Sequence, residues 1–369
     1  MASRKYWVGF NIVPSIGPAK VRALLDRFGD LETAWHADGP SLQDAGLDRK
    51  AISNLRQARA ELDLDAQMAD IEQRGLRVLT WEDTDYPPLL REIYGPPPVL
   101  YLRGTLLPED QWAVAIVGTR RATAYGKQAA RMLAHDLAQN GVTVVSGLAR
   151  GIDAEAHQGA LEAGGRTIAV MGCGLDRVYP PEHRHLAHRI AEHGALVGDY
   201  PVGTPPDARN FPPRNRIISG LSKGVLVVEA GAKSGALITV EFAGEQGRDV
   251  FAVPGNIVSR NSIGCNRLIQ NGAKMVLGVQ DILEELNMTM IEQQAEVRAT
   301  VPTNETEAHL LELISDQPLH VDEICRQSKL PVHQVSSTLA MMELKGLVRQ
   351  VGGMQYVVAR EQRVPYQIG

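Results

Sequence analysis

The sequence predicts an α/β protein built on a Rossmann-like, doubly wound parallel sheet, and two observations carry this prediction. From Trp112 onward, short continuous apolar runs alternate with helical segments, as expected for strands buried on both faces of a parallel sheet. The segment from Thr143 to Asp153 reads as a strand, a turn containing Gly147 and Gly151, and the start of a helix. Free backbone N–H groups at such a turn favour an anion.

The central domain is expected at residues 66–288. Its strands are predicted at Ala113–Val117, Val142–Val145, Thr167–Met171, Ala195–Val197, Gly224–Val228, Val250–Val253 and Met275–Leu277. Two earlier extended segments, Arg77–Trp81 and Val99–Leu102, are expected to widen the sheet at one edge. A chain of 369 residues exceeds one ordinary core, so we expect further domains on either side.

A small helical domain is predicted at residues 1–65. Apolar side chains recur at helical spacing from Val21 to Leu31, and a second helix is expected at Arg49–Leu62. Between them and the N-terminus, the segment PSIGPAK resembles the hairpin of a helix–hairpin–helix, in which Gly17 would free backbone N–H groups for a phosphate. A Gly-Pro turn that only opens a helix is the simpler interpretation. We therefore favour an auxiliary structural domain and keep direct DNA contact as the alternative.

The C-terminal part is predicted to be a linker at 289–304 followed by a winged-helix domain at 305–360. Helices at Glu305–Ser315, Val321–Gln327 and Pro331–Lys345 precede a short hairpin, an order that resembles a winged helix-turn-helix. Residues 305–349 hold four Lys or Arg against seven Asp or Glu. This net negative charge would repel DNA, so we expect the domain to dock protein. At least one of Met341 and Met342 should be buried.

Composition narrows the classes of function. The chain is 44% hydrophobic and 22% charged, with no run long enough for a membrane span and no apolar segment typical of a signal peptide. Three scattered cysteines without a CxxC pair predict neither a disulfide framework nor a zinc site, and they suit the cytoplasm. The net charge is −5, yet residues 205–274 hold nine basic against five acidic side chains. A nucleic-acid partner is therefore compatible with the local charge.

Four glycine-containing turns should meet at the carboxyl edge of the sheet, where open α/β sheets bind ligands. They are Gly118-Thr119-Arg120, Ser146-Gly147-Leu148, Gly172-Cys173-Gly174 and Lys233-Ser234-Gly235. The first turn lacks the GxGxxG pattern and the second strand does not end in an acid, so NAD or FAD is not expected and we predict no cofactor. No metal site is predicted. His185 and His188 are three residues apart, but no acidic residue stands at the spacing of a metal ligand.

Five separated motifs, taken in order, resemble the DNA-processing protein A family (DprA/Smf). They are AIVGTR ending at Arg120, SGLARGIDAEAHQGAL from Ser146, MGCGLDRVYPPEH from Met171, FPPRNRIISGLSKGVLVVEAGAKSGALIT from Phe211, and GRDVFAVPGN from Gly247. The resemblance covers about Trp81 to Leu286. It implies a homodimeric single-stranded DNA binder of natural transformation and recombination that helps load the RecA recombinase, with no catalytic activity.

The expected DNA-binding residues are selected from the glycine-containing turns and from the motifs that carry this resemblance. They are Gly118, Thr119, Arg120, Ser146, Gly147, Arg150, Arg214, Asn215, Arg216, Lys223, Lys233, Ser234 and Gly235. Arg214 and Arg216 do not share a helix face, so one should reach the groove while the other holds a carboxylate inside the fold. The resemblance puts Lys223 in the positive pocket. With aromatics at only 5% of the chain, no platform for base stacking is evident, so sequence preference should be slight.

Two other functions remain open alternatives. The central fold also resembles the cytokinin-activating phosphoribohydrolases, whose glycine-rich loop leads to a Thr and a Glu, loosely echoed by Gly235, Thr239 and Glu241. A nucleotide-processing enzyme of this type is the main alternative, although Lys233 stands where that family has a double-glycine loop. A transcription factor acting through the winged domain is the other. Asp153 and His157 are expected to cap and pack rather than to catalyse. Apolar positions around Asp281–Leu286 are expected to be exposed for dimer formation.

Overall fold

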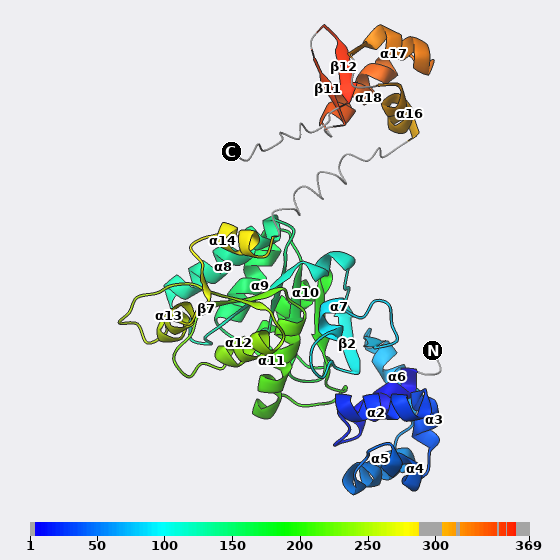
Figure 1. Cartoon of the computed structure of the whole chain (residues 1–369), viewed down its shortest axis with the longest axis vertical. Helices are drawn as coiled ribbons and strands as arrows, with labels where there is room; N and C mark the ends of the chain where they lie inside the picture. Colours follow the sequence, from blue (N-terminus) through cyan, green and yellow to red (C-terminus); the bar gives the residue numbers. More distant parts are fainter. Residues whose placement is uncertain (1–3, 288–304, 315–317, 345–346, 352, 359–369) are drawn as a thin grey trace, which may run out of the picture. The chain divides into compact units, whose positions relative to one another are not determined.

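The computed structural model describes residues 4–287, 305–314, 318–344, 347–351 and 353–358, coloured along the chain in Figure 1. The chain divides into two units, Met1–Met288 and Thr289–Gly369, which are treated separately below. The linker expected at 289–304 and the end of the third C-terminal helix at Lys345 lie outside the described residues. No helix in the described ranges has the length and apolar composition needed to span a bilayer.

A nine-stranded sheet forms the centre of the first unit, in the order β1-β2-β6-β5-β4-β3-β7-β8-β9. Its strands are β1 (Arg77–Thr80), β2 (Val99–Gly104), β3 (Ala113–Gly118), β4 (Thr143–Ser146), β5 (Thr167–Val170), β6 (Ala195–Gly198), β7 (Gly224–Glu229), β8 (Asp249–Ala252) and β9 (Lys274–Met275). The strands from β6 to β9 in this order are parallel, while β2 pairs antiparallel with β6 and β1 antiparallel with β2. The predicted α/β sheet, widened at one edge by the two early strands, is confirmed.

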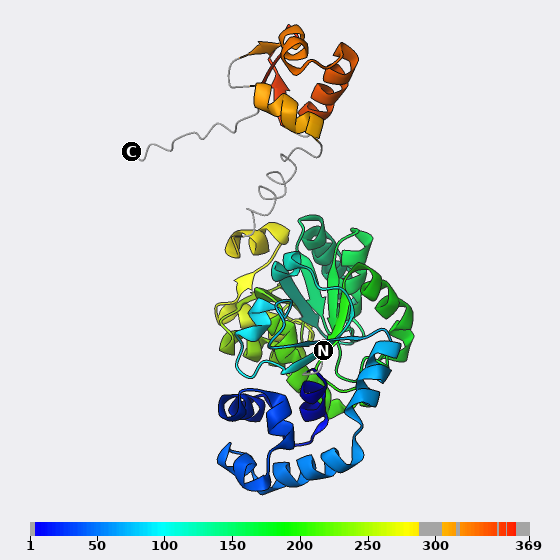
Figure 2. The same cartoon turned by 90° about the vertical axis from the view of Figure 1, so that its right-hand side faces the viewer.

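Helices cover both faces of this sheet, as Figures 1 and 2 show. On one face α8 (Ala124–Gln139), α9 (Ile152–Glu162) and α10 (Arg184–His193) pack in sequence, and on the other α11 (Phe211–Gly220) packs on α12 (Ala236–Glu245). The other helices between Arg77 and Asn287 are α7 (Pro88–Arg91), α13 (Ile263–Gln270) and α14 (Val279–Glu285). Three short 3-10 helices lie in the same range: η1 (Pro108–Gln111), η2 (Pro181–His183) and η3 (Ala208–Asn210). Because both faces are covered, every residue of β7 is buried, which explains its unbroken apolar sequence.

The order of the strands reverses beside β3. From β3 the chain moves outward to β4, β5 and β6, and it then returns through α11 to place β7 on the other side of β3. The loops after β3 and β7 therefore diverge at their carboxyl ends and leave a crevice between them. The backbone N–H of Thr119 donates to the carbonyl of Glu229 at 2.7 Å, which joins the two loops at their base.

Six helices precede the sheet in the same unit: α1 (Arg4–Ile12), α2 (Pro18–Phe28), α3 (Leu31–His36), α4 (Gly39–Asp44), α5 (Arg49–Glu61) and α6 (Leu64–Gln73). Four of them begin at an aspartate whose side chain accepts from a backbone N–H of the first turn, namely Asp30, Asp38, Asp48 and Asp63. The helices pack directly on the sheet edge: the rings of Trp7 and Trp81 lie 5.7 Å apart, and Tyr101 Oη donates to Asn11 Oδ1 at 3.0 Å.

The lysine of the PSIGPAK segment, Lys20, forms its contacts within the N-terminal helices. Lys20 Nζ donates to the carbonyl of Ser15 at 2.9 Å and pairs with Asp48 Oδ2 at 2.6 Å. The charge that a DNA-binding hairpin would direct at phosphate is therefore paired with a carboxylate of the same helical layer. This contact favours the structural interpretation of the N-terminal helices.

The second unit has the winged-helix arrangement expected from the sequence. It contains α16 (Glu305–Leu313), β10 (Leu319–His320), α17 (Val321–Ser328), α18 (Val332–Leu344), β11 (Val348–Gln350) and β12 (Gln355–Val358), with sheet order β10-β12-β11. Leu310, Ile324 and Leu339 form its core together with Met342, which is fully buried. Met341 is 51% exposed, so the expectation that at least one of the two methionines is buried is confirmed.

Candidate nucleic-acid interface

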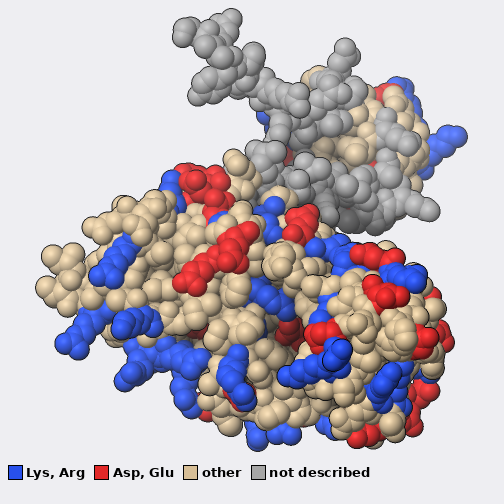
Figure 3. All heavy atoms as spheres, turned by 60° about the horizontal axis from the view of Figure 1, so that its bottom comes forward, with Lys and Arg blue, Asp and Glu red and all other residues tan. Residues whose placement is uncertain are grey.

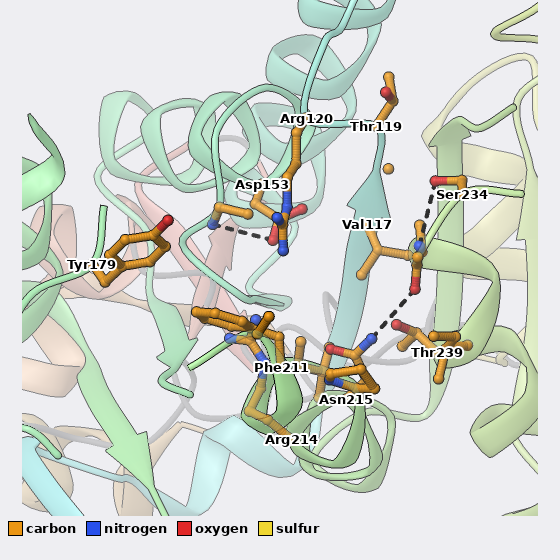
Figure 4. A pocket seen from close by; sticks show the side chains of 18 of the residues that line it. Val117, Thr119, Arg120, Asp153, Tyr179, Phe211, Arg214, Asn215, Ser234 and Thr239 are labelled. Carbon is orange, nitrogen blue, oxygen red and sulfur yellow. Dashed lines mark hydrogen bonds between the residues drawn. The ribbon is translucent and has the colours of Figure 1, made fainter. Parts of the chain in front are cut away.

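A pocket of about 540 Å³ opens at the crevice between the loops after β3 and β7 (Figure 4). The β3 loop, the start of α9, the segment around α11 and the start of α12 all contribute to its wall. Its lining includes Gly118, Thr119, Arg120, Arg121, Ala149, Asp153, Tyr179, Phe211, Arg214, Asn215, Ser234, Gly235 and Thr239. Seven of the thirteen residues that the sequence assigned to DNA binding thus line one pocket: Gly118, Thr119, Arg120, Arg214, Asn215, Ser234 and Gly235.

Two arginines of different burial supply the positive charge of the pocket. Arg120 follows β3, is exposed, and has its guanidinium carbon 5.5 Å from the centroid of the Phe211 ring. Arg214 on α11 is only 4% exposed, and its Nη1 donates to the carbonyls of Gly147, at 2.9 Å, and Val170. Burial lowers the pKa of Arg214 to about 10, so it stays protonated at neutral pH. Arg214 is a fixed cation, whereas Arg120 is free to meet a ligand.

The turn between β4 and α9 is held by Asp153. This buried carboxylate accepts from the N–H groups of Gly147 at 3.1 Å and Ala149 at 3.3 Å. Desolvation raises its pKa, and the neighbouring positive charge of Arg214 opposes that rise. A Cβ on Gly147 would lie 2.7 Å from Arg214 Nη2, and Gly151, at φ 76°, lies against the carbonyl of Thr119. These glycines are therefore required by close approach of the backbone.

Tyr179 and Phe211 bring two aromatic rings into the pocket wall. Their ring centroids are 5.5 Å apart, and the guanidinium carbons of Arg120 and Arg214 lie 5.5 Å and 5.7 Å from the Phe211 centroid. The pocket therefore contains an aromatic pair that the low overall aromatic content of the chain did not indicate. The signal was present in the sequence, because both rings stand beside prolines in YPP and FPP within the motifs already singled out.

The start of α12 forms the opposite wall. The N–H of Ala236 donates to Ser234 Oγ at 3.4 Å, and Asn215 Nδ2 donates to the carbonyl of Gly235 at 3.5 Å (Figure 4). Thr239, one turn into the helix, also lines the pocket. This wall therefore presents the hydroxyl groups of Ser234 and Thr239 at a helix N-terminus, where the helix dipole favours an anionic ligand.

Arg150 and Gly147 lie beside the main pocket in a smaller recess of about 30 Å³, which they share with Arg120, Tyr179 and Arg214. Arg150 is exposed, and its Nε pairs with Glu182 Oε1 at 2.5 Å. A ligand phosphate would have to compete with this carboxylate for Arg150. The residue is thus near the pocket, but its charge is partly neutralised.

Four expected DNA contacts lie elsewhere. Lys223 precedes β7 at the amino-terminal edge of the sheet, where its N–H donates to Ala113 and its ammonium lies 4.4 Å from the Trp112 ring centroid. Its assignment to the pocket is wrong. The resemblance gave the position of Lys223 in the chain, but it did not show that the residue lies at the amino-terminal end of β7, whereas the pocket lies at the carboxyl end. Ser146 is fully buried, and its Oγ donates to the carbonyl of Ile116. Lys233 is exposed just outside the lining residues.

The fourth is Arg216, whose Nη2 pairs with Asp199 Oδ2 at 2.6 Å. The two arginines of α11 thus separate: Arg214 reaches the pocket, and Arg216 holds a carboxylate away from it. This is the division predicted from their spacing on the helix. Arg216 does not line the pocket, and its charge is already paired, so the structure does not favour it as a DNA contact.

The residues that suggested catalysis have structural partners. His157 is fully buried with Nδ1 2.7 Å from Thr167 Oγ1, and burial lowers its pKa to about 3. Glu229 accepts from the N–H and Oγ1 of Thr123 and so fixes the start of α8. Glu241 is exposed and does not line the pocket with Thr239. In the described ranges no three His, Cys, Asp or Glu side chains form a group that could hold a metal.

The helix expected to expose apolar residues for a dimer does not do so. In α14, Ile282 is fully buried and Leu283 is 3% exposed, because both face the body of the unit. Beside it, however, a groove of about 260 Å³ is lined by Tyr125, Met132, Val253, Pro254, Val276 and Leu277. Leu277 is 72% exposed there. An apolar surface is present, but on the β9 edge and α8 rather than on α14.

The fold and the pocket together define a Rossmann-like protein that carries a cationic, aromatic-lined pocket at the carboxyl edge of its sheet. Comparison with known sequences makes this specific: residues 77–287 match the family described as DNA recombination-mediator protein A, and residues 294–354 match the DprA winged helix domain. The chain belongs to this DNA-processing protein A family. It is 38% identical to Protein Smf of Synechocystis sp. over 96% of this chain and 98% of that protein.

Two solved structures of the family are similar to this one. The X-ray structure of DNA processing protein A from Streptococcus pneumoniae has a TM-score of 0.68 and 35% identity, covering 77% of this chain and 98% of that chain. The structure describing the single-stranded DNA binding mode of DNA processing protein A from Helicobacter pylori has a TM-score of 0.52 and 32% identity, covering 58% of this chain and 97% of that chain. The predicted family is therefore confirmed, and its DNA-processing role is shared by these relatives.

Proposed function

We propose that this protein binds single-stranded DNA in the pocket between the β3 and β7 loops. The observation that carries the proposal is the approach of the Arg120 and Arg214 guanidinium groups to the Phe211 ring, with Tyr179 beside it. A single strand offers phosphates for the arginines and unpaired bases for the rings, whereas a duplex keeps its bases stacked inside. The single-stranded DNA binding mode described for the Helicobacter pylori relative supports the same ligand.

The protein acts, in this proposal, as a cytoplasmic recombination mediator that delivers the strand to RecA during natural transformation, without catalysis. It works as a homodimer through its central unit. The exposed apolar groove around Met132 and Leu277 supports such a contact. Two linked sites on one strand would raise the affinity through effective concentration. The acidic winged-helix unit would dock protein rather than DNA.

Binding of a labelled oligonucleotide, single-stranded against duplex, over a salt series tests the ligand. The affinity for the single strand should be higher, and its logarithm should fall with the logarithm of the salt concentration by about 0.7 per neutralised phosphate. Equal binding of both forms would contradict the assignment. Release of free base from nucleoside monophosphates would instead support the phosphoribohydrolase alternative.

A further inference from the structure

The loop between β8 and α13 presents two aliphatic side chains to solvent. Within Gly255–Ser262, Ile257 is 87% exposed and Val258 is 83% exposed. Single exposed apolar residues are common, but two adjacent β-branched residues at a loop tip form a small apolar surface. Nothing in the pocket described above accounts for them.

Hydrogen bonds hold this loop in shape. The N–H of Gly255 donates to Asn266 Oδ1 at 3.1 Å, and Asn266 Nδ2 donates back to the Gly255 carbonyl at 3.0 Å. Asn256 Oδ1 accepts from the N–H of Val258, and the carbonyl of Asn256 accepts from the N–H of Ser259, both at 3.0 Å. The tip that carries the aliphatic pair is therefore supported from both ends.

The base of the loop contacts one residue of the pocket wall and lies beside the turn that precedes Ser234. Asn261 Nδ2 donates to the carbonyl of Arg121 at 3.1 Å, and Arg121 lines the pocket. On the other side, a Cβ placed on Gly231 would lie 3.3 Å from the carbonyl oxygen of Arg260, so the loop contacts the turn that leads into Ser234.

Three cations belong to the loop or to the segments it contacts, namely Arg121, Lys233 and Arg260. All three are exposed, and none forms an ion pair with a carboxylate in the described part of the chain, unlike Arg150. Figure 3 shows Lys and Arg side chains gathered at the left of the view, the side on which Figure 1 draws α13, with few acidic side chains among them. Unpaired charge next to an apolar tip suits a ligand that carries both phosphates and bases.

We propose that the loop Gly255–Ser262 is a second contact for single-stranded DNA. Arg121, Lys233 and Arg260 hold the phosphates of the strand that leaves the pocket, while Ile257 and Val258 pack against its bases. Aliphatic side chains can separate or cover base steps because the faces of the bases are apolar. The inference rests on the proposed DNA pocket and extends its site by several nucleotides.

The test compares oligodeoxythymidylates of about six and about sixteen nucleotides, lengths within the range of known single-strand sites. In the full chain, Ile257→Ser combined with Val258→Ser should weaken binding of the longer oligonucleotide by about tenfold, which corresponds to the loss of roughly one base contact. Binding of the shorter one should not change. Tyr94→Ser, which removes a side chain that is 94% exposed outside both surfaces, is the matched control and should bind both like the parent.

Each outcome separates the two proposals. A parent protein that binds neither oligonucleotide contradicts the DNA pocket, whereas a double variant that binds the longer one like the parent contradicts only the loop. A change in the sedimentation of the double variant would identify the loop as a protein contact and overturn the inference. Arg260→Ala should also lower the salt slope for the longer oligonucleotide by about 0.7, while Lys50→Ala, an exposed cation of α5, should not.

Discussion

The pocket of the central unit and the winged-helix unit differ in how they use charge. Around the pocket, Arg120, Arg121 and Lys233 are exposed and form no ion pair with a described carboxylate, although the chain as a whole carries a net charge of −5. In the winged-helix unit Arg326 pairs with Glu323 and acidic residues outnumber basic ones. The comparison teaches that the local arrangement of charge, and not the total, indicates where a polyanion can bind.

Reversing the charge of Arg120 is expected to have the largest effect. Arg120→Glu removes a charge-assisted contact worth about 1.5–3 kcal/mol and adds repulsion, so single-strand affinity should fall by about a hundredfold or more. Fluorescence anisotropy with a labelled oligonucleotide measures this loss. Lys223→Glu is the matched control: because Lys223 lies at the other edge of the sheet, its reversal should leave affinity within about twofold of the parent. Equal losses in the two variants would place the site elsewhere.

Acid should destabilise the central unit through His157. Its pKa is about 3 in the folded protein against an ordinary 6.5, so the folded state disfavours the proton, and stability that is fully present above pH 6.5 is lost as the pH falls toward 3. Between pH 7 and pH 5, protonation linked to this histidine should lower the free energy of unfolding by about 2 kcal/mol. Urea unfolding of the parent and of His157→Gln at both pH values measures it.

The variant should lose this part of the pH dependence even if it is less stable overall. An equal pH dependence in the parent and in His157→Gln would contradict the role given to the buried histidine.

Removing the aromatic ring of Phe211 should weaken binding less than reversing Arg120. Stacking of a base on an aromatic side chain contributes about 1–3 kcal/mol, so Phe211→Leu should reduce single-strand affinity by about fivefold to a hundredfold. Phe211→Tyr keeps the ring and should bind like the parent. A loss of affinity in Phe211→Tyr equal to that in Phe211→Leu, with unchanged thermal stability of both, would speak against stacking.

Removal of the winged-helix unit should have the smallest effect on DNA. A chain ending at Asn304 keeps the whole pocket, so its single-strand affinity should stay within about twofold of the full chain, since an acidic unit adds no phosphate contacts. The same anisotropy titration applies. A loss of tenfold or more would abolish the contrast between the two units and give the winged helix a direct role in DNA binding.

Local sequence patterns were sufficient for the architecture. The short apolar runs predicted seven parallel strands because side chains buried on both faces leave a continuous hydrophobic signature. Gly118-Thr119-Arg120 could likewise be placed at the pocket, since a turn that directly follows a buried strand has only one edge of the sheet to occupy. The winged helix followed from three periodic segments and a hairpin.

Positions that depend on contacts between distant segments could be decided only by the tertiary structure. The spacing of Arg214 and Arg216 predicted that they separate, but only the packing of α11 against Gly147 and Asp199 determined which one reaches the pocket. Tyr179 and Phe211 are 32 positions apart in the chain, and their pairing exists only because the loops after β5 and β6 meet at one edge. The prediction for Lys223 was wrong because the sequence shows only that this residue adjoins β7. The direction of the strand places Lys223 at the amino-terminal edge of the sheet, opposite the pocket.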